Sequence, residues 1–168
     1  TNEMIVTKSG RRVFPPISIK IESKGLSPHD LYSFGIDAVQ VGDHRYKYIT
    51  ENGEWESIPL LVGASEENVK NDINWNIESP AKLEYWEKTT INFNKLKLTN
   101  GLTRKYGLIC LNSMRKYCLR LHIIKHSNQN VFFAYRRIPL AMTEFIAVTA
   151  YQNPEIVNLK IENNPFAK

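Results

Sequence analysis

Cysteine is scarce in this sequence, and long apolar runs are absent. The 168 residues contain two cysteines, Cys110 and Cys118, both in apolar stretches. Two cysteines are too few to hold a chain of this length together by disulfides, and their spacing is not that of a zinc site, so we predict reduced, buried thiols and no metal centre. No run of 18 or more apolar residues occurs and no charged-then-apolar leader opens the sequence, so we expect neither a membrane-spanning helix nor a signal peptide.

The common enzyme motifs are also missing. The sequence has no Gly-x-Ser-x-Gly, no phosphate-binding glycine loop, no His-Glu-x-x-His and no Cys-x-x-Cys. His122 and His126 fall in a segment of period two, so they do not share a helical face, and we expect them to be structural or solvated. The acids of residues 51–87 could include a carboxylate pair for glycoside hydrolysis, but nothing singles out two of them. We therefore predict a protein that is not an enzyme, with no cofactor and no small-molecule substrate.

Acidic residues are absent from one 50-residue stretch. Residues 88–137 contain eleven Lys and Arg and no Asp or Glu, whereas residues 51–87 contain nine acids against two lysines. If the strands of the basic stretch share a face, they produce a positive field that concentrates polyanions. The alternative is that these charges alternate around the fold and only keep it soluble.

Alternation of apolar and polar residues dominates the rest of the sequence. It occurs over residues 17–23, 89–99 and 117–125, which predicts strands with one buried face and, in the second, a bulge where the phase slips. Asn52-Gly53 lies between two further strand-like runs and predicts a type I′ hairpin turn. Additional strands are expected at 31–41, 107–112, 131–137 and 144–149. About eight short strands separated by turn residues predict an all-β sandwich or barrel.

Two short helices are expected. The first is predicted around residues 80–88, with Ser79 as its N-cap and Pro80 at its first position. The second is predicted from Asn153-Pro154-Glu155, a sequence typical of a helix start, although residues 157–162 also alternate like a strand. Pro165 would end this second helix.

Three segments carry residues suited to nucleic acid. In the first, Lys8, Arg11 and Arg12 surround Gly10, so a rigid turn would present paired guanidinium groups, and arginine matches guanine O6 and N7 in the major groove. The second segment, residues 113–120, is basic and suited to phosphates. In the third, Phe166 stands next to a proline, as do apolar side chains that enter the minor groove. The alternatives are that the arginines are solvated turn charges and that Phe166 folds back onto the sandwich.

These segments carry a family resemblance. TNEMIVTKSGRR, RYKY, SPA, KLKLTN, LNSM, RLHI, FIAVTAYQN and NPFAK occur in an order that resembles the T-box family of transcription factors across the whole chain. The resemblance implies an immunoglobulin-like β-sandwich with a few short helices, including C-terminal short helices, that binds duplex DNA in the nucleus. It implies a single domain over residues 1–168, without the family's opening Trp-containing segment and its last C-terminal residues.

The resemblance also assigns roles to residues. The arginine that contacts a guanine of a GTG-containing half-site falls at Arg11 or Arg12, with Arg11 the first choice. The family's Thr-Ala-Tyr-Gln-Asn motif, near the DNA backbone, falls at residues 149–153, and its minor-groove helix at residues 163–168. The DNA-contacting residues expected on these grounds are Lys8, Arg11, Arg12, Ser113, Arg115, Lys116, Arg120, Thr149, Tyr151, Gln152, Asn153, Lys160, Asn163, Asn164, Pro165, Phe166, Ala167 and Lys168.

The sequence departs from the family in its centre. Residues 115–119 read Arg-Lys-Tyr-Cys-Leu, where family members usually have His-Lys-Tyr followed by proline. This is the region where family members can meet a second protomer on palindromic DNA, so the sequence leaves monomer and dimer open. Two other functions also stay open: an immunoglobulin-like protein-interaction module with a basic face, and a single-strand binder that stacks bases on Tyr and Phe.

Overall fold

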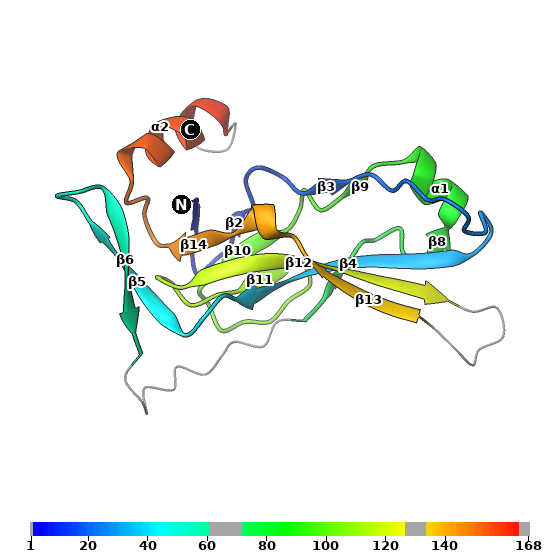
Figure 1. Ribbon diagram of the computed structural model, residues 1–168, viewed down its shortest axis with the longest axis horizontal. Coiled ribbons are helices and arrows are strands. Elements are labelled where there is room, and N and C mark those ends of the chain that lie inside the picture. The colour runs from blue at the N-terminus through cyan, green and yellow to red at the C-terminus, as the bar shows by residue number, and fades with distance from the viewer. Residues whose placement is uncertain (1, 61–71, 127–133, 165–168) are drawn as a thin grey trace.

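The computed structural model describes residues 2–60, 72–126 and 134–164 (Figure 1). One layer of the fold is a seven-stranded sheet built around two long strands, β4 and β12. These two strands pair antiparallel from Tyr117 opposite Gln40 to His126 opposite Leu31. The strands of this sheet are β1 (Glu3–Ile5), β4 (Leu31–Gln40), β7 (Asn74–Trp75), β8 (Ala81–Lys82), β12 (Lys116–His126), β13 (Ala134–Pro139) and β14 (Phe145–Val148).

Each edge of the β4–β12 pair is extended by two shorter strands. β7 and β8 pair with β4, whereas β13 and β14 pair with successive parts of β12. The 3-10 helix η1 (Ala141–Thr143) separates β13 from β14. The first strand, β1, runs parallel to β14, so the start of the described chain lies beside a strand more than 140 residues further along.

Shorter strands and two helices complete the fold. Residues Arg11–Arg12 (β2), Lys97–Thr99 (β10) and Leu108–Cys110 (β11) form one small sheet, and Ser18–Ile19 (β3) pairs with Ile91–Asn92 (β9). His44–Ile49 (β5) and Glu54–Pro59 (β6) form a hairpin. The helices are α1 (Leu83–Lys88) and α2 (Pro154–Asn163).

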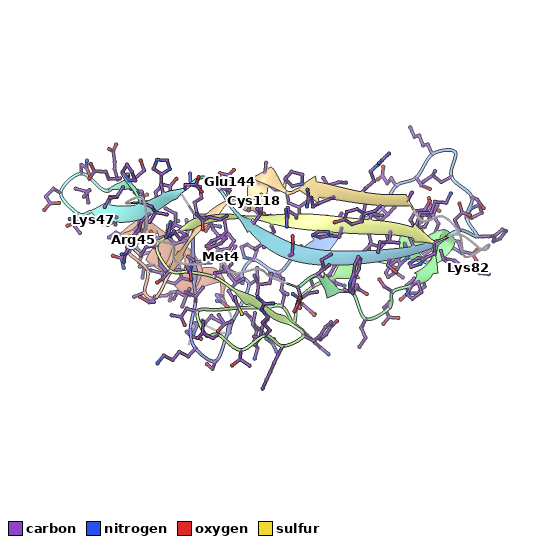
Figure 2. All side chains as sticks on the ribbon, turned by 90° about the horizontal axis from the view of Figure 1, so that it is seen from below. Met4, Arg45, Lys47, Lys82, Cys118 and Glu144 are labelled. Atoms are coloured by element: carbon purple, nitrogen blue, oxygen red, sulfur yellow. The ribbon has the colours of Figure 1, made fainter. Side chains whose placement is uncertain are left out.

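The core lies between the large sheet and the smaller strands with α1. Phe34 and Leu119 of the two long strands pack into one buried cluster with Leu98 of β10 and Trp86 of α1. Burying a side chain of this size contributes about 1.5–3 kcal/mol, which explains why the alternating pattern determines the sheet faces. Figure 2 shows the two long strands side by side along the long axis of the molecule, with the β5–β6 hairpin extending beyond one end of them. The prediction of an all-β, immunoglobulin-like sandwich with few short helices is confirmed.

Two local strand predictions are wrong. Residues 89–99 are not one bulged strand: β9 and β10 belong to different sheets, because a turn closed by a 3.1 Å hydrogen bond from Leu96 N to Phe93 O lies between them. The β5–β6 hairpin has a four-residue loop, since Ile49 pairs with Glu54, and within that loop only Gly53 has positive φ. A type I′ turn needs positive φ at both central residues, so the turn is of another type.

The two helix predictions differ in outcome. α1 begins at Leu83 rather than near Pro80, because Ser79 Oγ accepts a 3.0 Å hydrogen bond from Phe34 N and does not cap the helix. The start of α2 is confirmed, since Asn153 Oδ1 accepts a 2.9 Å hydrogen bond from Glu155 N. Any further helix at residues 165–168 lies outside the described residues.

Other sequence predictions concern the cysteines and membrane segments. Cys110 and Cys118 are both buried and carry free thiols, as predicted, and burial raises the pKa of Cys110. In the described part of the chain, neither helix has the length and apolar character to cross a membrane.

Candidate nucleic-acid interface

A tight turn precedes the two arginines of β2. It is closed by a 3.1 Å hydrogen bond from Gly10 N to Thr7 O, and Gly10 has a φ of +86°. A Cβ atom at this position would also lie 2.8 Å from Cδ2 of Leu108. The positive φ favours glycine in this turn, which leads directly into Arg11.

The two arginines are not presented together. Arg11 is half-buried opposite Leu98, and Arg12 is exposed opposite Lys97. Successive residues of a strand point to opposite faces, so the sequence-based expectation of a guanidinium pair is wrong. A ligand approaching one face of β2 meets one arginine.

A fully buried carboxylate joins the N-terminal strand to the start of α2. Glu3 is 0% exposed, and its Oε2 and Oε1 atoms accept hydrogen bonds from Gln152 N (2.7 Å) and Asn153 N (3.0 Å). These bonds hold the two residues that precede the helix. Sequence reasoning missed Glu3, because nothing in a single acid near the N-terminus indicates that its partners are backbone groups at residues 152 and 153.

A buried lysine makes a second connection between the same regions. Lys160 of α2 is 6% exposed, donates a 2.5 Å hydrogen bond from Nζ to Phe14 O, and lies 5.6 Å from the centroid of the Phe14 ring. Desolvation lowers the pKa of Lys160, and the charge of Glu3 acts in the opposite direction. Lys160 therefore fixes α2 against the segment that follows β2, and its ammonium group does not face outward.

The pKa of Tyr151 is affected by charges from both of these regions. Burial raises its pKa, the charge of Arg11 acts against that shift, and the charge of Glu3 adds to it. The charge of Arg11 thus acts on Tyr151, although about 140 residues separate them in sequence. The structure therefore brings the first of the three segments near residues 151–153, to which the family resemblance assigned a role.

The second segment, residues 113–120, holds charged residues in different environments. Arg115 is 2% exposed and Arg120 pairs with Asp37, so neither guanidinium is placed like a phosphate contact. Lys116 is half-buried, and its Nζ lies 5.3 Å from the centroid of the Tyr46 ring. Lys116 pairs with Ile146 of β14, which in turn pairs with Glu3, so Lys116 lies in the same row of the sheet as Glu3.

The remaining candidate residues differ in exposure. Ser113 and Asn153 are half-buried and Asn164 is buried, with a 2.9 Å hydrogen bond from its N–H to Lys160 O. Pro165, Phe166, Ala167 and Lys168 lie outside the described residues. The exposed candidates are Lys8, Arg12, Thr149, Gln152 and Asn163.

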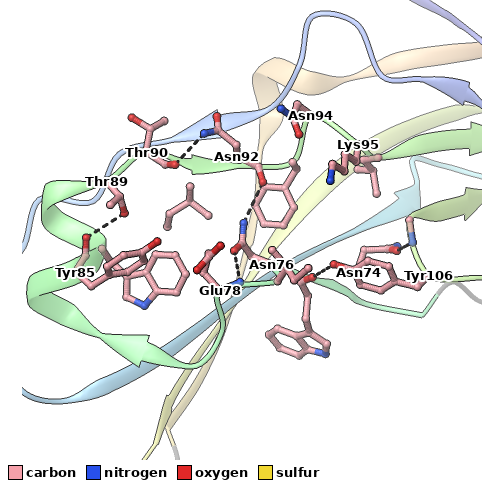
Figure 3. Close-up of a pocket in the computed structure, with 17 residues that line it drawn as sticks. Asn74, Asn76, Glu78, Tyr85, Thr89, Thr90, Asn92, Asn94, Lys95 and Tyr106 are labelled. Carbon is pink, nitrogen blue, oxygen red and sulfur yellow. Dashed lines mark hydrogen bonds between the residues drawn. The ribbon is translucent and has the colours of Figure 1, made fainter.

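A cavity of about 540 Å³ lies elsewhere, between α1, β7 and β9 (Figure 3). Its central amide, Asn76, donates to Asn92 O at 3.0 Å and accepts from Glu78 N at 2.9 Å. Asn74 likewise accepts from Gly107 N at 2.7 Å. These amides already have partners inside the protein, so the cavity walls are structural. Within the described ranges, no cluster of three or more His, Cys, Asp and Glu could hold a metal ion.

Comparison with known proteins identifies relatives across the full length of the chain. A model of the T-box family matches residues 1–168. The chain is 41% identical to T-box protein 2 of Caenorhabditis elegans, over 99% of the chain and 38% of that protein. It is 47% identical to the T-related protein of Drosophila melanogaster and 44% identical to T-box transcription factor T of Canis lupus familiaris, in both cases over 100% of the chain. It covers 22% of the former and 36% of the latter, so it spans well under half the length of these relatives.

Proposed function

The chain belongs to the T-box family of transcription factors, and we propose that it is the domain with which a nuclear transcription factor binds specific duplex DNA sequences. The family consists of transcription factors rather than enzymes.

One observation supports the proposal most strongly: the segment around Arg11 and the start of α2 are fixed to each other. Glu3 holds residues 152 and 153, and Lys160 holds Phe14. A base-reading side chain and a groove-binding helix must keep a fixed separation to contact the same duplex, and two buried charged connections supply that rigidity.

The proposed contacts divide by role. Arg11 or Arg12 contacts a guanine of a GTG-containing half-site in the major groove, because arginine matches the O6 and N7 acceptors of guanine. The C-terminal end of α2, with Phe166 beyond it, enters the minor groove. Phosphate contacts come from Lys8, Lys116, Thr149, Tyr151, Gln152 and Asn153. Arg115, Arg120 and Lys160 are left out of this set, because burial or an internal partner occupies each of them.

Substituting Arg11 and Arg12 one at a time tests which of them contacts a base and which does not. Because Arg11 and Arg12 face opposite sides of β2, replacing one of them with alanine should cost about 1–3 kcal/mol on a GTG site and relax the preference at one base, whereas replacing the other should not. Binding to duplexes with each base substituted in turn measures both effects. Unchanged base preference in Arg11→Ala and in Arg12→Ala would remove β2 from the proposed contact set.

Lys116→Ala tests the phosphate role. Losing one phosphate contact should weaken binding to all duplexes alike and reduce the slope of log K against log salt by about 1. Lys125→Ala is the matched control, since Lys125 lies near the opposite end of β12 and pairs with Asp30 at 2.6 Å. Titrations over a range of salt concentrations give the slopes; equal slopes for the two variants would contradict a specific role for Lys116.

Selection from a random duplex library at about 150 mM salt tests the function as a whole, because nonspecific phosphate binding is weak under those conditions. We expect enrichment of a GTG-containing motif. Paired half-sites among the selected sequences would indicate a second protomer on palindromic DNA. Binding without enrichment, or equal competition by heparin and by single strands, would contradict the proposal.

A further inference from the structure

Strand β13 forms an exposed margin of the large sheet. All six of its residues, Ala134–Pro139, are exposed. One edge of β13 pairs with β12, and among the described residues no strand pairs with its other edge. Figure 2 shows β13 as the outermost of the three strands β13, β12 and β4.

The pairing with β12 determines which backbone groups of β13 point outward. Leu140 N donates a 2.8 Å hydrogen bond to Leu119 O directly opposite, and antiparallel ladders alternate between bonded and non-bonded pairs. Ile138 and Arg136 therefore use their N–H and C=O groups toward β12. The N–H and C=O groups of Tyr135 and Arg137 point away from it, and Pro139, which has no N–H, ends the free edge.

The side chains along this edge are basic and apolar. Arg136 and Arg137 are exposed and, as neighbours in a strand, lie on opposite faces of the sheet. The apolar side chains beside them are also unusually open: Tyr135 is 41% exposed, Ile138 is 44% exposed and Met142 of η1 is 96% exposed. No acidic residue occurs in the edge.

This edge lies apart from the proposed DNA interface. In Figure 1, β13 lies away from α2, on the side of the molecule that carries α1 and β8. A ligand on β13 and a duplex at β2 and α2 can therefore bind at the same time.

We propose that β13 binds an extended acidic segment of a partner protein, which adds to the sheet as a strand. The outward N–H and C=O groups of Tyr135 and Arg137 supply the backbone hydrogen bonds, which is how strand addition provides affinity. Acidic side chains of the segment lie against Arg136 on one face and Arg137 on the other, and aliphatic side chains cover Ile138. Opposite charges across neighbouring strands stabilise the pairing.

A second copy of this chain fits the edge less well. An antiparallel pairing of two β13 strands that uses the outward groups of both Tyr135 and Arg137 places Arg136 directly opposite its own copy. Like charges in directly opposite positions are destabilising. The charge of the edge thus favours an acidic partner over self-association.

The test measures binding of a labelled synthetic peptide, acetyl-Val-Asp-Glu-Val-Glu-Asp-Ile-Val-amide, to the 168-residue chain in complex with duplex DNA. We expect saturable binding by fluorescence anisotropy, and slower amide exchange at Tyr135 and Arg137 but not at Arg136 and Ile138, whose N–H groups are already bonded to β12. A peptide with lysine at each acidic position should not bind. A peptide with alternate backbone amides methylated should also fail, because it keeps the charge and loses the donors.

Charge reversal supplies the matched variants. Arg136→Glu combined with Arg137→Glu should weaken acidic-peptide binding by about tenfold or more and create binding of the lysine peptide, since two cross-strand pairs change sign. Arg104→Glu with Lys105→Glu changes the charge of another exposed basic pair equally and should leave peptide binding unaltered. Unchanged duplex binding by the β13 variant shows that it is folded.

Three results would overturn the proposal. They are equal binding of the methylated peptide, an equal loss in the Arg104→Glu/Lys105→Glu control, and concentration-dependent dimerisation through β13 in place of peptide binding. The first would indicate charge attraction without strand addition, the second a diffuse field, and the third an interface between copies of the chain.

Discussion

Replacing Asp37 with alanine should lower the free energy of unfolding by about 3–5 kcal/mol, because it leaves charged partners without their counter-ion inside the sheet. The Asp37 side chain is 6% exposed. It accepts hydrogen bonds from Arg120 Nε at 2.9 Å and Arg120 Nη2 at 2.5 Å, and its Oδ1 lies 2.8 Å from His122 Nε2, within ion-pairing distance. Urea unfolding of the two proteins measures the difference.

The same group gives the stability a dependence on pH. Burial alone would raise the pKa of Asp37, but the hydrogen bonds and charges of Arg120 and His122 outweigh burial and hold it below its usual value of 3.8. A carboxylate with a lowered pKa in the folded state stabilises the protein above its unfolded pKa, and this contribution is lost as the pH falls through the folded value. The difference in unfolding free energy between the natural protein and Asp37→Asn should therefore be smaller at about pH 2.5 than at about pH 5.

Asp30→Asn is the matched control for Asp37. Asp30 pairs with Lys125 at 2.6 Å, but both side chains are much more open to water than Asp37, and exposed pairs contribute little. We expect no resolvable change in urea midpoint. Equal effects at Asp37 and Asp30 would mean that burial of the Asp37 pair has no energetic importance.

Glu3→Ala should destabilise the fold by about 3–6 kcal/mol, because each hydrogen bond to a charged group contributes about 1.5–3 kcal/mol and the buried carboxylate accepts two. The variant should also bind duplex DNA more weakly, since residues 152 and 153 lose the acceptors that fix the start of α2. Unfolding in urea and duplex titration measure the two effects separately. Because an unfolded variant would be uninformative about binding, the titration is made where circular dichroism shows the folded state.

Glu3→Gln and Glu155→Gln sharpen the interpretation. Glutamine at position 3 keeps one oxygen acceptor and replaces the other with a donor, so it should retain part of the stability and part of the DNA affinity. Glu155, in the first turn of α2, is exposed and should tolerate the change. DNA binding that survives Glu3→Ala at full strength would show that the duplex itself can position α2.

The long elements could be predicted from the sequence because their side chains repeat one simple pattern. The strands predicted over residues 31–41 and 117–125 match β4 and β12, and the helix-start residues of α2 are correct because a cap depends only on local groups. A prediction from local sequence is wrong where a residue far away along the chain binds the same group. Serine is a common N-cap residue, but the hydroxyl of Ser79 accepts a hydrogen bond from Phe34 N. The helix α1 therefore begins at Leu83.

The burial and the partner of each charged residue in the predicted segments could not be predicted from the sequence. Three basic residues that the sequence suggests as phosphate contacts are each buried or paired internally: Arg115, Arg120 and Lys160. Sequence alone cannot distinguish them from Lys116, because the distinction depends on Asp37 and Phe14, which lie far away along the chain. The role of Glu3 could not be predicted for the same reason, because its partners are at residues 152 and 153.

The parallel pairing of β1 with β14 has a consequence for how the protein is made. Glu3 binds backbone groups 149 and 150 residues further along the chain, so the junction between β1 and the start of α2 cannot assemble until those residues have left the ribosome. Contacts between such distant residues form slowly, because a long loop must close before they stabilise anything. During synthesis the β4–β12 pair can form before β1 pairs, because the partner of β1 lies more than 140 residues further along the chain.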